Sequence, residues 1–101
     1  MFRHLFMAEF KDDVSEEIRR KEIDDLRAMK DKIPNILDVQ ANRTVGWIGK
    51  KDLITMTVDV ASKEDFDAFQ AHPYHAEYIS ETGIKYCKPD SFVVGQIEFL
   101  K

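Results

Sequence analysis

The sequence has one cysteine, three prolines and four glycines among its 101 residues. The single cysteine, Cys87, cannot form a disulfide within the chain, which suits a reducing compartment. No window approaches the roughly 18 apolar residues of a membrane span. The stretch MFRHLFMAEFKDD also lacks the continuous apolar run of a secretory signal. We therefore expect a cytoplasmic protein that does not enter a membrane.

Basic residues are also too few and too scattered for a nucleic-acid binder. Lysine and arginine total 15 against 19 acidic residues, which gives a net charge of −4, and the longest basic runs are residues 19–21 and 50–51. Proteins that bind nucleic acid rely on clustered positive charge to neutralise phosphates. The turn GWIGKK lacks the spacing and the following helix of a phosphate-binding loop. We expect no nucleic-acid partner.

Alternating and helical patterns divide the chain into four strands and two helical regions. Residues 2–10 alternate, which predicts a strand, and a helical repeat of apolar residues follows from about residue 15 to Pro34. The segments 36–45 and 53–60 alternate again and flank a glycine turn, which predicts an antiparallel hairpin. Ser62 starts a second helix, which Pro73 divides from a third over 74–86. SFVVGQIEFL is the last strand.

This order predicts an α+β, ferredoxin-like domain spanning residues 1–101, with helices on one face of a four-stranded antiparallel sheet. The opposite face then carries a mixture of apolar residues and threonines. Such a face would expose a large apolar patch, so we expect a homodimer formed by packing sheet against sheet. The residues expected there are Leu5, Met7, Leu53, Thr55, Thr57, Phe92 and Val94.

Three histidines are candidates for chemistry. His4 shares the helix-facing side of the first strand with Phe2, Phe6 and Ala8, so it is either a buried, hydrogen-bonded core residue or part of a pocket. His75 lies in the first turn after Pro73, where a helix N-terminus would lower its pKa and favour a general base. The alternative is that its ring packs the helix junction.

The third histidine, His72, precedes Pro73 and is expected to be structural. It lies three residues from His75 across a helix break, which does not guarantee that the two rings converge. Structural zinc needs four ligands and catalytic zinc three, and Cys87 has no spaced partner. We therefore predict no metal site.

Four bulky side chains are expected between the sheet and the helices. They either fill an ordinary core or line a pocket for a small hydrophobic or aromatic ligand, in which Tyr78 could orient a ligand oxygen. These residues are Phe6, Met56, Phe69 and Tyr78.

Three segments carry a resemblance to a known family. HLFMAEFKDDVSEE, IPNILDVQANRTV and above all DFDAFQAHPYHAEY resemble the stress-responsive dimeric α/β-barrel (Dabb) proteins, and the similarity runs nearly end to end. The resemblance implies a ferredoxin-like subunit and a homodimer whose two sheets form a barrel.

One member class, the olivetolic acid cyclase type, closes a linear polyketide by an aldol condensation without metal or cofactor. The resemblance implies that His4 and His75 occupy its catalytic positions, and hence a cofactor-independent cyclase, isomerase or lyase. The chain departs from that class at Leu26 and Phe69, where the cyclases carry pocket tyrosines. Two alternatives remain open: a non-catalytic ligand-binding or stress-associated dimer, and a cofactor-free monooxygenase.

Overall fold

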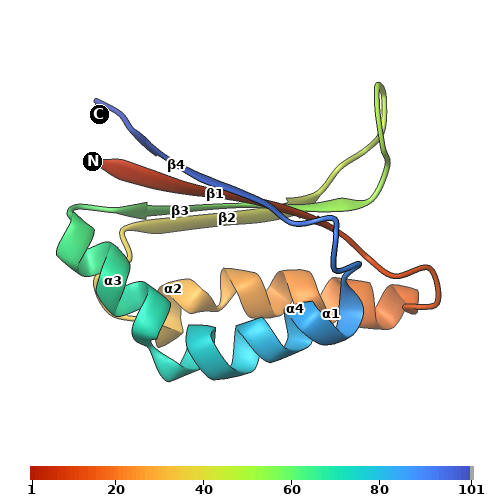
Figure 1. Cartoon of the computed structure of the whole chain (residues 1–101), viewed down its shortest axis with the longest axis horizontal. Helices are drawn as coiled ribbons and strands as arrows, with labels where there is room; N and C mark the ends of the chain where they lie inside the picture. Colours follow the sequence, from red (N-terminus) through yellow and green to blue (C-terminus); the bar gives the residue numbers. More distant parts are fainter. Residues whose placement is uncertain (101) are drawn as a thin grey trace.

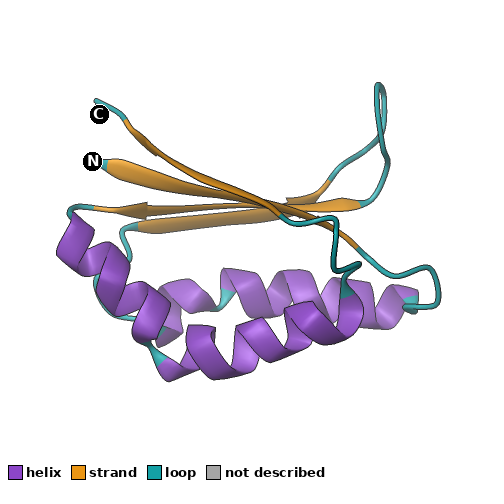
Figure 2. Ribbon diagram, viewed as in Figure 1, coloured by secondary structure: helices purple, strands orange, loops and turns teal. Residues whose placement is uncertain are grey.

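A computed structural model describes residues 1–100 as one sheet covered on one face by helices (Figure 1). The strands are β1 (Phe2–Glu9), β2 (Asp38–Arg43), β3 (Leu53–Val60) and β4 (Val93–Glu98). They are ordered β2-β3-β1-β4 and every neighbouring pair is antiparallel. The helical layer lies on one side of the sheet and the other side is open (Figure 2). This confirms the predicted ferredoxin-like α+β fold.

The first helical region begins at α1 (Glu16–Arg27), where the hydroxyl of Ser15 accepts a hydrogen bond from the Ile18 amide. Two glutamates in the first turn favour that end through the helix dipole. The helix is interrupted at Ala28 and resumes as α2 (Met29–Lys32) before Pro34. The sequence predicts one continuous helix here, because the apolar repeat runs through the interruption without a break.

The second helical region has three parts. Ser62 caps α3 (Lys63–Ala71), and His72 ends it in an extended conformation ahead of Pro73. The chain then forms the π-helix η1 (Tyr74–Ile79), which continues into α4 (Ser80–Tyr86). The predicted join at Pro73 is confirmed, but the predicted helix over 74–86 begins with a wider turn. A wider turn of this kind is frequent at functional sites.

The core lies between the sheet and the helices. Strand β3 turns Ile54, Met56, Val58 and Val60 inward, as its alternation predicts, and α1 supplies Ile23 and Leu26. Because β1 and β3 are the central strands, most of their inward residues are buried. Alternation therefore sufficed to predict which face of the sheet is buried.

The predicted outer face is correct for β1 but wrong for the last strand. Leu5 and Met7 lie on the open side and are about one-third exposed. Val94, however, pairs with the inward-facing Phe6, and the Phe92 ring packs 5.8 Å from the Phe6 ring, so both lie on the helix side. The segment FVVGQI has apolar residues at successive positions, so hydrophobicity alone does not determine which of them face the helices.

The loop between β2 and β3 extends from the sheet toward the side without helices (Figure 1). It carries three exposed apolar side chains, Val45, Trp47 and Ile48, and Trp47 is 93% exposed. No helix in residues 1–100 is long and apolar enough to cross a membrane.

Candidate functional site

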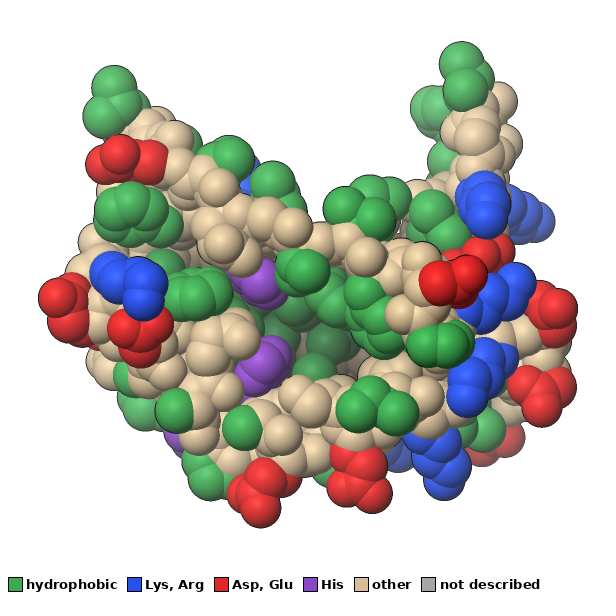
Figure 3. All heavy atoms as spheres, in the orientation of Figure 1, with side chains coloured by type: hydrophobic (Ala, Val, Ile, Leu, Met, Phe, Trp, Pro, Cys, Tyr) green, Lys and Arg blue, Asp and Glu red, His purple; other side chains and the backbone are tan. Residues whose placement is uncertain are grey.

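A cavity of about 280 Å³ lies between the sheet and two helical segments, α1 and the η1–α4 segment. It appears as a hollow with hydrophobic walls and histidine side chains beside it (Figure 3). A cavity of about 150 Å³ is enough to hold benzene, so this one takes a molecule of one ring or more. It is lined by Phe6, Glu22, Leu26, Ile54, His75, Ile79, Ser80, Gly83, Ile84, Cys87 and Phe92.

His75 borders this cavity from the first turn of η1. Its Nδ1 lies 3.2 Å from the carbonyl oxygen of Gln70. A carbonyl oxygen can only accept, so Nδ1 carries the proton and Nε2 of the neutral ring keeps its lone pair. Burial lowers the pKa of His75, partly opposed by the Gln70 carbonyl. The predicted direction of the pKa shift is thus confirmed, but its main cause is burial rather than the helix N-terminus.

The wide turn of η1 has its own hydrogen bond next to this histidine. The hydroxyl of Ser80 donates to the carbonyl oxygen of His75 at 2.9 Å. The backbone amide of Ser80 also donates to this carbonyl oxygen, which is the wider hydrogen bond of a π-helix. The ring of His75 is therefore held from Gln70 and its backbone from Ser80.

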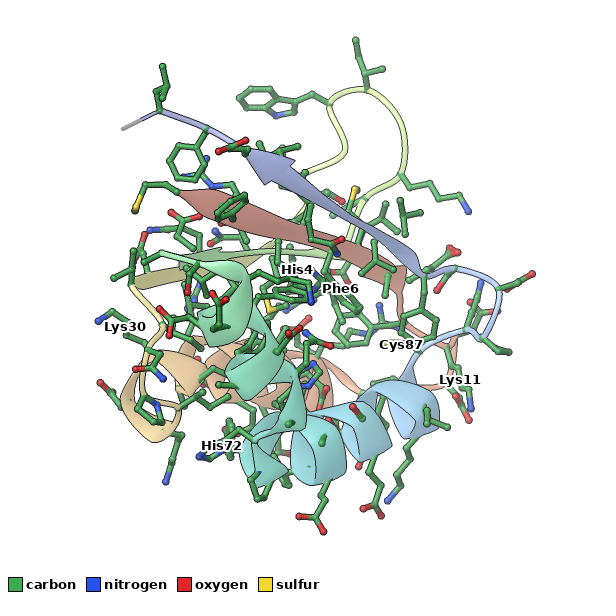
Figure 4. The ribbon with its side chains drawn as sticks, turned by 60° about the vertical axis from the view of Figure 1, so that its left-hand side comes forward. His4, Phe6, Lys11, Lys30, His72 and Cys87 are labelled. Carbon is green, nitrogen blue, oxygen red and sulfur yellow. The ribbon has the colours of Figure 1, made fainter. Side chains whose placement is uncertain are left out.

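His4 is buried under the helices, as Figure 4 shows for His4 and Phe6. The side-chain amide nitrogen of Gln96 lies 3.0 Å from its Nδ1. An amide nitrogen can only donate, so Nδ1 accepts and Nε2 carries the proton in the neutral ring. Burial, and then the charge of His75, lower the pKa of His4. The two neutral imidazoles thus have opposite tautomers: His75 presents an acceptor and His4 a donor at Nε2.

The side chain of Phe69 lies between the two histidines. Its ring centroid is 5.9 Å from that of His4 and 4.7 Å from that of His75, and it is fully buried. His4 borders a different cavity, of about 190 Å³, with Phe66 and Gln96 in its wall. The structure therefore brings both histidines to one aromatic residue, but each borders its own cavity rather than a shared one.

Of the four predicted pocket residues, Phe6 alone lines the cavity beside His75. Met56 and Phe69 are buried core residues. Tyr78 lies on the outer side of η1 and not between sheet and helices: its hydroxyl accepts from Lys21 and donates to the Asp25 carboxylate, both at 2.7 Å. The polar surface of α1 thus holds the tyrosine away from the cavity, because its hydroxyl finds two partners there.

His72 makes a local hydrogen bond of the kind that a structural role requires. Its Nδ1 accepts from the Tyr74 amide at 3.1 Å, and it lies on the far side of the helical layer from the sheet (Figure 4). Within residues 1–100, no three histidine, cysteine, aspartate or glutamate side chains gather closely enough to hold a metal ion.

Comparison with known proteins places this geometry in a family. The model of the stress responsive A/B barrel domain matches residues 2–95. The chain belongs to this family. No curated protein matches the sequence.

Solved structures with the same fold as this A/B barrel domain have low sequence identity to it. The Arabidopsis thaliana protein At3g17210 is 19% identical, with a TM-score of 0.82 over 100% of this chain and 97% of that one. A dimeric ferredoxin-like protein of unknown function from Thermobifida fusca is 19% identical, with a TM-score of 0.81 over 97% and 90%. A hydroxynitrile lyase from Passiflora edulis is 17% identical, with a TM-score of 0.79 over 95% and 90%.

The A/B barrel domain also carries a buried acid in its cavity that the sequence interpretation missed. Glu22 is only 4% exposed and lines the cavity from α1. Burial raises its pKa, the hydroxyl of Thr82 opposes this, and the charge of Asp25 adds to it. The run EEIRRKEIDDLR is rich in charged residues, so composition does not distinguish Glu22 from its neighbours. The signal was its spacing, since it stands four residues before the buried Leu26 on the same helix face.

Cys87 lies at the other end of this cavity from the start of η1, just after α4. Burial, with the charge of Glu22, raises the pKa of its thiol to about 11. The thiol is therefore neutral at physiological pH and is not an activated nucleophile.

Proposed function

We propose that this A/B barrel domain is a cofactor-independent enzyme in which His75 acts as general base on a small, largely apolar substrate. The observation that carries the proposal is the fixed tautomer of His75. The Gln70 carbonyl holds the proton on Nδ1, so Nε2 is free to accept a proton at the wall of a cavity of about 280 Å³. The lowered pKa keeps the ring neutral and ready to accept a proton at pH 7.

The chemistry that this arrangement supports is removal of a proton from an acidic C–H or O–H group. Nε2 of His75 takes the proton, and the bonding electrons remain on the substrate. With a C–H donor beside a carbonyl they form an enolate. With a hydroxyl donor they form a carbonyl while a neighbouring C–C bond breaks and its carbon leaves with that bond's electrons. The imidazolium then returns its proton to the product or to the leaving group, so the ring ends unchanged.

We assign His4 a second role in this reaction, as a hydrogen-bond donor to an oxygen that gains negative charge. Its tautomer supports this, because Gln96 occupies Nδ1 and leaves the Nε2 proton for a ligand. The role requires a substrate that reaches past Phe69, since the two rings border different cavities. A hydroxynitrile lyase of the same fold supports the lyase form of the proposal.

We also propose that the domain functions as a homodimer, with a second copy covering the open face of the sheet. That face and the loop beside it expose Leu5, Met7, Val93, Ile97 and Trp47. An apolar surface of this extent is unusual on a monomer, and a dimeric protein of the same fold is known from Thermobifida fusca.

The test uses two probe reactions that require a base and no cofactor. One is cleavage of mandelonitrile, followed through the absorbance of benzaldehyde. The other is deuterium uptake at the α-carbon of acetophenone in D2O, followed by NMR. Because general base catalysis contributes about 10²- to 10⁴-fold, His75→Ala should lower the accelerated rate by at least about 100-fold. His72→Ala is the matched control, since His72 lies two residues before Tyr74 on the outside of the same helical region.

Circular dichroism and sedimentation establish that each variant is folded and has the same mass in solution as the wild type. The base assignment fails if His75→Ala retains the wild-type rate. If the wild type accelerates neither reaction over buffer while small aromatic molecules still bind the cavity, the domain is a ligand-binding protein instead.

A further inference from the structure

The cavity beside His75 contains an acidic side chain without a cationic partner. Glu22 is only 4% exposed and lines the cavity, yet no lysine, arginine or histidine of residues 1–100 forms an ion pair with it. A buried carboxylate without a counter-ion is costly, because the protein interior replaces its hydration poorly. Burial accordingly raises the pKa of Glu22, and a cation bound beside it would favour the ionised form.

The neighbouring polar groups do not neutralise this charge. Lys21, the preceding residue of α1, is held by Asp25 at 2.8 Å and by the Tyr78 hydroxyl at 2.7 Å on the outer side of the helix. Its charge is the smallest influence on the pKa of Glu22. The hydroxyl of Thr82 donates to the Ile79 carbonyl oxygen at 3.1 Å, and its interaction with Glu22 only partly opposes the effect of burial on the pKa of that carboxyl. The surroundings of Glu22 therefore leave its carboxylate open to a positively charged group in the cavity.

The rest of the wall defines the body of such a ligand. Phe6, Leu26, Ile54, Ile79 and Ile84 surround the space. These side chains favour an aromatic or branched aliphatic group, and the volume admits one ring with a short side chain.

The two polar points of the cavity are separated along the η1–α4 segment. His75 stands near the beginning of this segment, whereas Glu22 interacts with the hydroxyl of Thr82, which lies in α4. A ligand that contacts both points therefore carries its charged group away from the atom that reacts at His75.

We propose that the cavity binds a small apolar amine, with its ammonium group at Glu22 and its reacting C–H or O–H group at His75. This inference rests on the proposed function only in placing the reacting group at His75; the amine preference concerns Glu22 alone. The ammonium group would supply the missing counter-charge, and the apolar walls would hold the carbon body. Glu22 is then the residue that selects amines over neutral molecules of the same shape.

The test compares three probes of nearly equal size: benzylamine, benzyl alcohol and toluene. Their dissociation constants at pH 7.5 are measured by NMR chemical-shift titration on the wild type, Glu22→Gln and Glu17→Gln. The last variant is the matched control, because it removes the same charge from an exposed position of α1. Glu22→Gln keeps the shape and a hydrogen-bonding group but removes the negative charge.

Wild type and Glu17→Gln should bind benzylamine at least about tenfold more tightly than benzyl alcohol or toluene. Glu22→Gln should lose this preference while its affinity for benzyl alcohol stays within about twofold. The proposal is overturned if benzylamine shows no preference in the wild type, if Glu22→Gln keeps it, or if none of the probes binds. Failure of the catalytic proposal would instead appear as amine binding without proton transfer.

Discussion

Replacing Phe69 by alanine tests whether this residue both supports the core and separates the two histidines. The Phe69 ring is fully buried and contacts the rings of His4, Phe66 and His75 at centroid distances of 5.9, 6.0 and 4.7 Å. Phe69→Ala removes all three contacts and leaves a hole between the two cavities that His4 and His75 border.

The expected loss of stability is about 3–5 kcal/mol, the usual cost of truncating a buried phenylalanine to alanine. Domains of this size are stable by about 5–15 kcal/mol, so the variant should fold but unfold at much lower denaturant. With a slope of about 1–3 kcal/mol per molar urea, the midpoint should fall by about 2 M. Phe69→Leu keeps most of the volume and loses mainly the aromatic contacts, so its cost should be about 1–2 kcal/mol.

Urea titrations followed by circular dichroism measure these differences, and NMR titration of the histidine ring protons measures the second effect. If water enters the hole, burial no longer lowers the pKa of His4 and His75 as strongly, and both values should rise toward the ordinary value for histidine. A loss below about 1.5 kcal/mol, or unchanged histidine titrations in a folded Phe69→Ala protein, would refute the position given to this side chain.

Three further predictions concern acid stability, thiol reactivity and assembly. His4 and His75 have lowered pKa values when folded, so on acidification the unfolded chain takes up protons before the folded one. Their contribution to the free energy of unfolding should therefore fall as the pH drops below about 6.5. In a His4→Phe/His75→Phe variant the melting temperature should depend less steeply on pH, and an equally steep dependence contradicts this. The buried Cys87 thiol, with a pKa of about 11, should react with iodoacetamide at pH 8 only after denaturation, and rapid labelling of the native protein would disprove its burial. Diluting the protein should separate the proposed dimer and expose Trp47, the one tryptophan of the chain, to water. Its fluorescence emission should then shift to the red and the melting temperature should fall. Emission and melting temperatures that do not depend on protein concentration argue against the dimer.

The sequence predicted those parts of the fold in which one face of an element is clearly apolar. The alternation in β1 and β3 placed His4, Phe6 and Met56 on the helix side, and Pro73 divided two helices as expected. In β4, apolar residues stand at successive positions, so the pattern did not determine which of them face the helices. Pairing with β1 turns Phe92 and Val94 toward the helix side.

The site could be predicted only where a residue, such as a proline, determines the local backbone structure. His75 follows Pro73, which fixes the start of the helical segment, and it borders a cavity, although not one shared with His4. Tyr78 was misplaced because its hydroxyl is held by Lys21 and Asp25 of a helix more than fifty residues away in the chain. Long-range polar contacts of this kind leave no local pattern in a sequence.

The wide turn at η1 determines how the His75 ring is oriented relative to α4. An α-helix turns about 100° per residue, so removing one residue between His75 and Ser80 would rotate the imidazole relative to α4. A single deletion could therefore turn the base away from the cavity while every neighbouring helix keeps its own contacts. In this chain the base could be lost by a change in helix length alone, with His75 itself still present.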